Sequence, residues 1–202
     1  MSREPLTSPR PALFAGAVCL TILGGMLTAH AWPLWTGRTV ILAVRPVDPR
    51  DLFRGEFVRL DTPLTTISIV RPSASSAGDA TLVTTVGEWP SGDMRGRVVY
   101  VQLEPRPDVP ATALGPEYRA VTISVNPVKG ALNLRGRVRS VITQDAVRVD
   151  YGLDAFFMEE GKPRGIEDAI RAGRRVQMEV AVASSGRARI RNLIVDGTPL
   201  RR

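Results

Sequence analysis

The chain has 202 residues, of which 44% are hydrophobic, enough for one membrane segment and one domain with its own core but not for a second domain. The net charge is +7, and 27 residues are basic; only Lys129 and Lys162 are lysines, which leaves 25 arginines. The single cysteine, Cys19, and the single histidine, His30, both lie in the apolar N-terminal segment, which excludes thiol and imidazole catalysis and His or Cys metal sites in the rest of the chain. We therefore expect no enzymatic activity, no cofactor and no metal.

An apolar run over residues 12–35 follows a short tail, residues 1–11, and closes with Trp32 and Trp35. About 20 apolar residues cross a bilayer, and tryptophan favours the headgroup level. The run predicts a single-pass transmembrane anchor in a cell inner membrane, with a domain over residues 38–202 outside the cytoplasm. The alternative is a signal peptide cleaved near Ala31, because Ala29-His30-Ala31 has the small residues of a processing site. The domain would then be secreted or periplasmic.

Residues 39–44 are continuously β-branched or apolar, which predicts a strand buried on both faces or one that joins a sheet directly after the membrane. The stretch that follows, residues 46–60, is a compact turn that leads into a strand. Asp48 before Pro49 reads as a helix N-cap, Asp51 as a capping acid, and Gly55 ends the turn.

From Glu56 onward the period becomes two, which places Glu56 on the same side as Val58 and Leu60. A carboxylate at the edge of a core needs a partner, and Arg50 or Arg54 is close enough in sequence to supply it. We expect Glu56 to be ionised and paired there.

The octapeptide Gly55-Glu56-Phe57-Val58-Arg59-Leu60-Asp61-Thr62 resembles the motif of the GDYXXLXY family of membrane-anchored bacterial proteins. Gly55 and Leu60 match, Glu56 and Phe57 are near matches, and Thr62 replaces the last tyrosine. The likeness continues along nearly the whole chain, at residues 151–152, 156–157, 160–161, 166–167 and 196–197. The resemblance implies membrane anchoring and an envelope location, and it implies no known activity.

The turn and motif supply the first group of candidate site residues for contact with a partner, most plausibly another membrane protein; a purely structural role in the turn is the alternative. The group consists of Pro46, Asp48, Arg50, Asp51, Arg54, Gly55, Glu56, Phe57 and Leu60.

Beyond the motif, alternating or β-branched runs predict strands at residues 64–70, 96–103, 118–125, 132–142, 147–151, 176–182 and 187–191. Residues 71–80 have loop composition, the proline-rich residues 105–116 are irregular, and residues 165–173 form a short helix. The predicted fold is mainly β with one short soluble helix (α+β): a transmembrane helix followed by a curled antiparallel sheet or small barrel, with the soluble helix covering one end.

Two strands carry arginine at every second position. Arg135, Arg137 and Arg139 alternate with Leu134 and Val138, and a second set, Arg187, Arg189 and Arg191, alternates with smaller apolar residues. If the two strands share a face, they concentrate positive potential that suits an anionic lipid or polymer, whereas nucleic acid is not expected. The alternative is a solvated face whose arginines pair with Asp145, Asp150 and Glu179.

A last set of candidates is acidic. Glu160 and Glu167 flank the Lys162-Pro163-Arg164 loop, where a carboxylate-dependent hydrolase or a divalent-cation site can be imagined. Capping and solvation explain the same residues, since an acid in the first turn of a helix is favoured by the helix dipole. The sequence as a whole favours a non-catalytic binding module.

Overall fold

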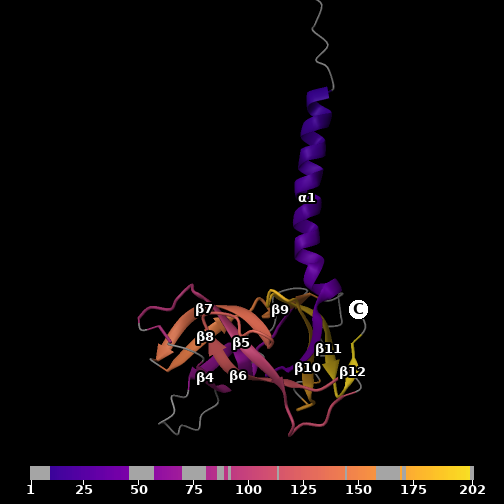
Figure 1. Ribbon diagram of the computed structural model, residues 1–202. Coiled ribbons are helices and arrows are strands. Elements are labelled where there is room, and N and C mark those ends of the chain that lie inside the picture. The colour runs from indigo at the N-terminus through magenta and orange to yellow at the C-terminus, as the bar shows by residue number, and fades with distance from the viewer. Residues whose placement is uncertain are drawn as a thin grey trace, which may run out of the picture.

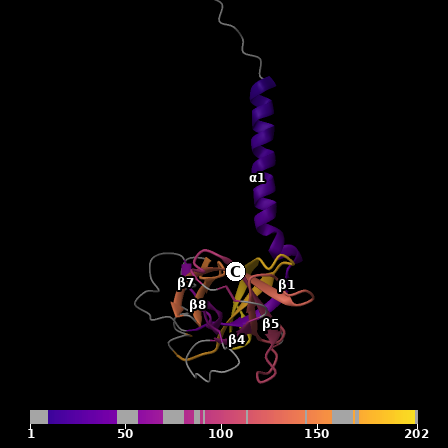
Figure 2. The ribbon, with the colours of Figure 1, turned by 60° about the vertical axis from the view of Figure 1, so that its left-hand side comes forward.

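The computed structural model describes residues 10–45, 57–69, 81–85, 89–90, 92–112, 114–143, 145–157, 169 and 172–200 (Figure 1). One long helix, α1 (Arg10–Thr36), rises from a β domain and stays clear of it over most of its length (Figures 1 and 2). The strands are β1 (Arg38–Ala43), β2 (Phe57–Arg59), β3 (Thr66–Ile69), β4 (Thr81–Thr85), β5 (Val98–Pro105), β6 (Tyr118–Ser124), β7 (Leu132–Thr143), β8 (Ala146–Asp150), β9 (Ala155–Phe157), β10 (Val176–Val182), β11 (Ala188–Val195) and β12 (Thr198–Pro199), with a 3-10 turn, η2 (Pro63–Thr65), before β3.

Six strands close into a barrel in the order β3-β4-β6-β5-β7-β8. Strand β4 pairs in parallel with both β3 and β6, and the other pairings are antiparallel. The predicted small barrel is therefore confirmed, but its strands are not all antiparallel. Strand β4 is also missing from the sequence prediction: it is a short, threonine-rich segment, and its place depends on pairing with β3 and with the more distant β6.

The second sheet has the order β1-β10-β11-β12 and is antiparallel throughout. Strand β1 is buried on both faces, as predicted: Val40 and Leu42 join the core shared with the barrel, while Ile41 on the opposite face is 1% exposed. The sheet and the barrel thus share one hydrophobic core.

A separate pair of strands carries part of the motif. Strand β2 pairs antiparallel with β9, with Phe57 opposite Phe157 and Arg59 opposite Ala155. The next motif residue, Leu60, is 4% exposed in the main core, and its N–H donates to the Asp154 carbonyl over 2.9 Å. Leu60 is thus a packing residue of the domain.

Apolar side chains of α1 face outward along its length, and they include Leu13, Phe14, Leu20 and Leu27, each 70–73% exposed. Within the residues whose side chains are described, no helix combines the length and the apolar character needed to cross a membrane. The predicted helix is confirmed, whereas the predicted membrane span stays a prediction.

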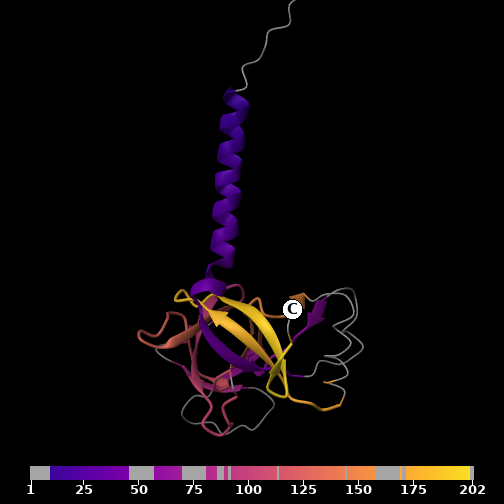
Figure 3. The same cartoon turned by 90° about the vertical axis from the view of Figure 1, so that its right-hand side faces the viewer.

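Arg191 of β11 attaches the foot of α1 to the domain. In Figure 3 the foot of the helix lies above the yellow strands. The Arg191 Nη2 donates to the Leu34 carbonyl at 2.6 Å and to the Gly37 carbonyl at 3.4 Å, and its Nη1 donates to the Thr39 hydroxyl at 2.7 Å. A cation is favoured there because the last carbonyls of a helix lack intrahelical donors and carry partial negative charge.

Several predicted features lie outside the described residues. They are the turn up to Glu56 with its pairing to Arg50 or Arg54, the loop at 71–80, and the acidic candidates Glu160 and Glu167. Of the predicted helix at 165–173, the structure describes Ala169, which is buried against Val176 and Val195, and residues 172–173.

Candidate functional site

A cavity of about 490 Å³ lies where the barrel, the second sheet and α1 meet. Its charged lining comes from three strand regions: Arg135 and Arg137 of β7, Arg187 and Arg189 at the start of β11, and Asp150 at the end of β8. Four arginines and one aspartate therefore line the same space. We call it the arginine cavity.

The two arginine sets meet because the β10–β11 turn touches β7. The N–H of Arg135 donates to the Gly186 carbonyl over 2.8 Å. Gly186 has a φ of 79°, and a Cβ at this position would lie 3.0 Å from the Arg135 Cβ and 3.1 Å from the Asn133 carbonyl oxygen. Only glycine fits this contact without displacing backbone, so Gly186 determines how closely β7 and the hairpin approach.

Strand periodicity explains which side chains line the cavity. Leu134 and Val138 are buried in the core, so Arg135 and Arg137 point away from it. The Arg137 Nη1 donates to the Gly96 carbonyl at 2.9 Å, which orients its guanidinium. Arg135 and Arg137 thus line one space together with Arg187 and Arg189, which is the condition under which the sequence suggested a concentrated positive potential.

The third arginine of each set, Arg139 or Arg191, is not part of the lining of the arginine cavity. Arg139 lines a smaller cavity of about 50 Å³ together with Arg148. Arg191 holds the foot of α1. The predicted three-arginine face of β7 is thus divided between two neighbouring cavities, which share Asp150 and Tyr151 in their linings.

The smaller cavity is where the motif approaches the arginines, since Leu60 and Thr62 also line it. Tyr151 lines both spaces, and its hydroxyl donates to the Leu64 carbonyl over 3.1 Å. Burial raises the pKa of Tyr151 well above its ordinary value, so the phenol stays protonated and keeps this donor role. The end of the octapeptide thus supports one wall of the site and is not itself part of the large cavity.

The remaining wall of the arginine cavity is apolar and comes from the helix. Met26 and Ala29 of α1 line it, and Met26 is 66% exposed. Trp35, at the foot of the same helix, is 73% exposed. The cavity therefore combines a strongly basic floor with one apolar side.

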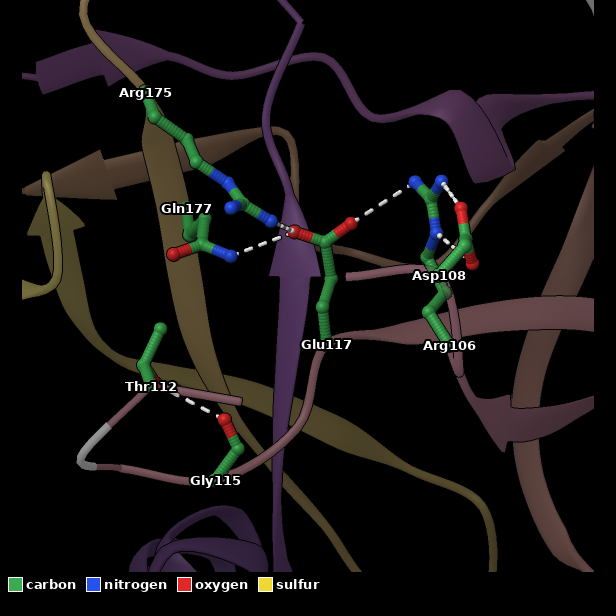
Figure 4. A network of polar contacts seen from close by, with 7 residues as sticks. All are labelled: Arg106, Asp108, Thr112, Gly115, Glu117, Arg175 and Gln177. Carbon is green, nitrogen blue, oxygen red and sulfur yellow. Dashed lines mark hydrogen bonds and ion pairs between the residues drawn. The ribbon is translucent and has the colours of Figure 1, made fainter. Parts of the chain in front are cut away.

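A second polar cluster lies away from this cavity and is centred on Glu117 (Figure 4). Glu117 is 2% exposed; its Oε1 accepts from Arg106 Nη1 at 3.2 Å, and its Oε2 accepts from Arg175 Nη2 at 2.7 Å and Gln177 Nε2 at 2.6 Å. Two of the three bonds join the β5–β6 connection to Arg175 and Gln177, 58 and 60 residues further along the chain, and the bond from Arg106 lies within that connection. The three bonds compensate the desolvation of the carboxylate.

Two details complete this cluster. Arg106 also pairs with the exposed Asp108, and the hydrogen bond from Arg106 lowers the pKa of that carboxyl. Gln177 is 1% exposed, and its Oε1 has no hydrogen-bond partner among the described residues. The cluster is a structural tie between the barrel and the second sheet.

Sequence reasoning missed this tie. Glu117 follows a proline-rich stretch that carries no period, and its partners lie 11, 58 and 60 residues away. Gln177 alternates with apolar residues of β10, and the segment that carries Glu117 covers that face of the sheet and buries the amide. The one available signal for the tie was Gln177, a polar residue in the strand that pairs with the buried strand β1.

A further ion pair yields a prediction on pH. The pKa of Asp196 is lowered by the hydrogen bond from Arg174 Nε, which is 2.6 Å from Oδ2, although its own desolvation opposes the shift. Because the folded pKa lies below the unfolded one, this stabilisation is present above the unfolded pKa and is lost as the pH falls through the folded pKa. The Arg174→Ala change should raise the Asp196 pKa toward its ordinary value in an NMR titration, while that of Asp108 stays unchanged. An unmoved Asp196 would contradict the assignment.

The fold and the site define a β-barrel domain with a flanking sheet, an exposed N-terminal helix and an arginine-lined cavity at the foot of that helix. The chain belongs to the GDYXXLXY family: the model of this family, described as GDYXXLXY protein, matches residues 19–193. No curated protein and no solved structure gives a significant match. The family assignment confirms the resemblance seen in the octapeptide. It assigns no activity to the chain.

Proposed function

We propose that the protein is a non-catalytic binding module that α1 holds at a membrane, where the arginine cavity binds the anionic headgroup of a lipid. The observation that supports the proposal most is the meeting of four arginines from two sheets with the apolar side of α1 in one cavity. Such a pairing suits a ligand that is anionic at one end and apolar at the other.

The membrane part of the proposal rests on the surface of α1. Besides the exposed leucines and Phe14, two threonines in the middle of the helix have their hydroxyls satisfied: Thr21 donates to the Ala17 carbonyl and Thr28 to the Gly24 carbonyl, both over 2.8 Å. Hydroxyls bonded within the helix remove the main cost of placing threonine in lipid. The exposed Trp35 suits the headgroup level at the foot of the helix.

The headgroup part rests on the chemistry of arginine. Guanidinium groups bind phosphate oxygens through two parallel hydrogen bonds and keep their charge at any physiological pH. Anionic leaflets also attract basic groups close to the surface by about 1 kcal/mol each. With α1 in the bilayer, the arginine cavity would lie at the level of the lipid phosphates.

The test is native mass spectrometry of the full chain in a neutral detergent, with dioleoyl phosphatidylglycerol or dioleoyl phosphatidylcholine added. We expect adducts with phosphatidylglycerol and few with phosphatidylcholine. The double variant Arg135→Gln/Arg187→Gln should bind phosphatidylglycerol about tenfold more weakly or worse, because charge-assisted hydrogen bonds are lost.

A matched control removes the same net charge elsewhere. Arg95 and Arg119 are exposed and lie outside the lining of the arginine cavity, so Arg95→Gln/Arg119→Gln should bind as the unchanged chain does. Equal weakening in both double variants would show that general charge, and not the cavity, attracts the lipid. Equal binding of the two lipids would contradict the proposal outright.

The predicted contact with another membrane protein through residues 46–60 rests on a turn outside the described residues and stays a prediction. Inner-membrane location with an extracytoplasmic domain belongs to the same proposal, and protease accessibility of the domain in spheroplasts is its test. Crosslinking from position 50 or 54 tests the protein contact separately.

A further inference from the structure

One acidic side chain lies among the arginines of the cavity. Asp150 lines the arginine cavity at the end of β8, and in the strand register it lies directly opposite Arg137 of β7. Residues directly opposite each other on neighbouring strands project from the same face of a sheet. Their neighbours Val149 and Val138 are each 1% exposed in the core, so Asp150 and Arg137 project from the other face, which lines the cavity.

This register favours an ion pair between the two side chains, but none forms. The Arg137 Nη1 donates instead to the Gly96 carbonyl at 2.9 Å, and Asp150 belongs to none of the ion pairs between described residues. The Asp150 Oδ1 accepts from the Gly152 N–H at 2.8 Å, which closes a short turn after β8. An ionised carboxylate has about four acceptor sites on its two oxygens. Asp150 therefore keeps acceptor capacity for a further donor.

The arginines of the cavity are not equivalent. Arg189 has an interaction of its own, and Arg137 is held by its bond to the carbonyl. The guanidiniums of Arg135 and Arg187 have no partner among the described residues, so these two can contact a phosphate. The lining thus offers donors for a phosphate and, in the same space, one acceptor on Asp150.

The acceptor changes what the cavity favours. A phosphate on its own is repelled by a carboxylate in the same space, because the two charges have the same sign. A headgroup that also carries a hydroxyl can donate to that carboxylate and form a charge-assisted hydrogen bond. An ammonium is a poorer donor here, because four arginines line the same cavity and repel a further cation.

On the basis of the proposed function, we propose that Asp150 determines which anionic lipid the cavity prefers, namely one whose headgroup carries a hydroxyl beyond the phosphate. The phosphate binds Arg135 and Arg187, and the hydroxyl donates to Asp150. Phosphatidylglycerol has such hydroxyls. Phosphatidylethanol carries the same single negative charge but has no hydroxyl on its headgroup, and it is then a weaker ligand of the same site.

The experiment places dioleoyl phosphatidylglycerol and dioleoyl phosphatidylethanol in competition for the full chain in neutral detergent, with native mass spectrometry as the readout. We expect about fivefold preference for phosphatidylglycerol, the effect of one hydrogen bond. Asp150→Asn keeps an oxygen for the Gly152 N–H but replaces the other carboxylate oxygen with an amide donor. This variant should lose the preference and bind phosphatidylethanol more tightly than the unchanged chain does, because the repulsion is gone.

Asp93→Asn is the matched control. Asp93 is exposed and lies outside the lining of the arginine cavity, and its Oδ1 accepts from the Arg95 N–H at 2.9 Å, two residues ahead, as that of Asp150 does from Gly152. The control removes the same charge from the same kind of turn. It should keep the preference and leave phosphatidylethanol binding unchanged.

The outcomes separate this inference from the proposed function. Equal binding of the two lipids by the unchanged chain, or a preference that persists in Asp150→Asn, would overturn the role of Asp150 while leaving anionic lipid binding intact. Equal tightening of phosphatidylethanol binding in both aspartate variants would also overturn it, because general charge would then be the cause. Binding of phosphatidylcholine as tight as that of both anionic lipids would overturn the proposed function itself.

Discussion

Replacing Glu117 with alanine is expected to lower the free energy of unfolding by about 2 to 4 kcal/mol. Arg106 and Arg175 are 36% and 46% exposed in their side chains and can turn to water, but Gln177 is 1% exposed and cannot. Its Nε2 would lose its acceptor on Glu117, beside an Oε1 that has no hydrogen-bond partner among the described residues. Urea denaturation of the full chain in neutral detergent, followed by circular dichroism, measures the loss.

Two variants sharpen this test. Asp108→Ala removes the exposed partner of Arg106 and should change stability little, because exposed ion pairs contribute little. Glu117→Met/Gln177→Met replaces both buried polar groups by apolar ones and should cost less than Glu117→Ala alone. A Glu117→Ala chain as stable as the unchanged one would refute the structural tie.

The change Gly136→Ala is expected to cost about 2 to 3 kcal/mol through overpacking. A Cβ on Gly136 would lie 2.3 Å from Val149 Cγ1 and 2.8 Å from Tyr151 Cδ1, distances at which the neighbours must move. Val149 is 1% exposed in the barrel core and Tyr151 is bonded to the Leu64 carbonyl, so neither side chain has room to yield. The same denaturation measurement applies.

A double-mutant cycle identifies the cause of that cost. Val149→Ala removes the nearest atom, so its combination with Gly136→Ala should be more stable than the sum of the two single changes by about 1 kcal/mol or more. Strict additivity would mean that the Gly136 effect does not arise from contact with Val149. Reduced lipid binding in Gly136→Ala is a further expectation, because the glycine lines the arginine cavity.

Local patterns predicted the parts of the fold that depend on local chemistry. The uninterrupted apolar run of β1 predicted burial on both faces or a strand that joins a sheet directly after the membrane, and the first is observed; the alternation of arginine with Leu134 and Val138 predicted which face of β7 is basic. Both follow from the two-residue period of a strand and the exclusion of unpaired charge from a core.

The structural features that the sequence did not reveal depend on contacts between residues far apart in the chain. The parallel pairing of β4 with β6, the burial of Gln177 and the meeting of the arginine pairs at Gly186 each require a partner tens of residues away. The glycine between Arg135 and Arg137 was a usable signal for close packing, since glycine inside a strand often marks the approach of another group. The octapeptide located the family, whereas the arginine cavity lies mostly outside it.

The short passage from α1 to β1 has a mechanical consequence. Only Gly37 separates the end of the helix at Thr36 from the first residue of the strand, and β1 is joined to β10 by six successive residue pairs, from Arg38 opposite Val182 to Ala43 opposite Gln177. A pull on the helix acts along β1 and loads these pairings together in shear, not one after another as in unzipping. Tension or tilt in the helix therefore reaches the sheet that carries Arg187 and Arg189 without first being absorbed by a linker.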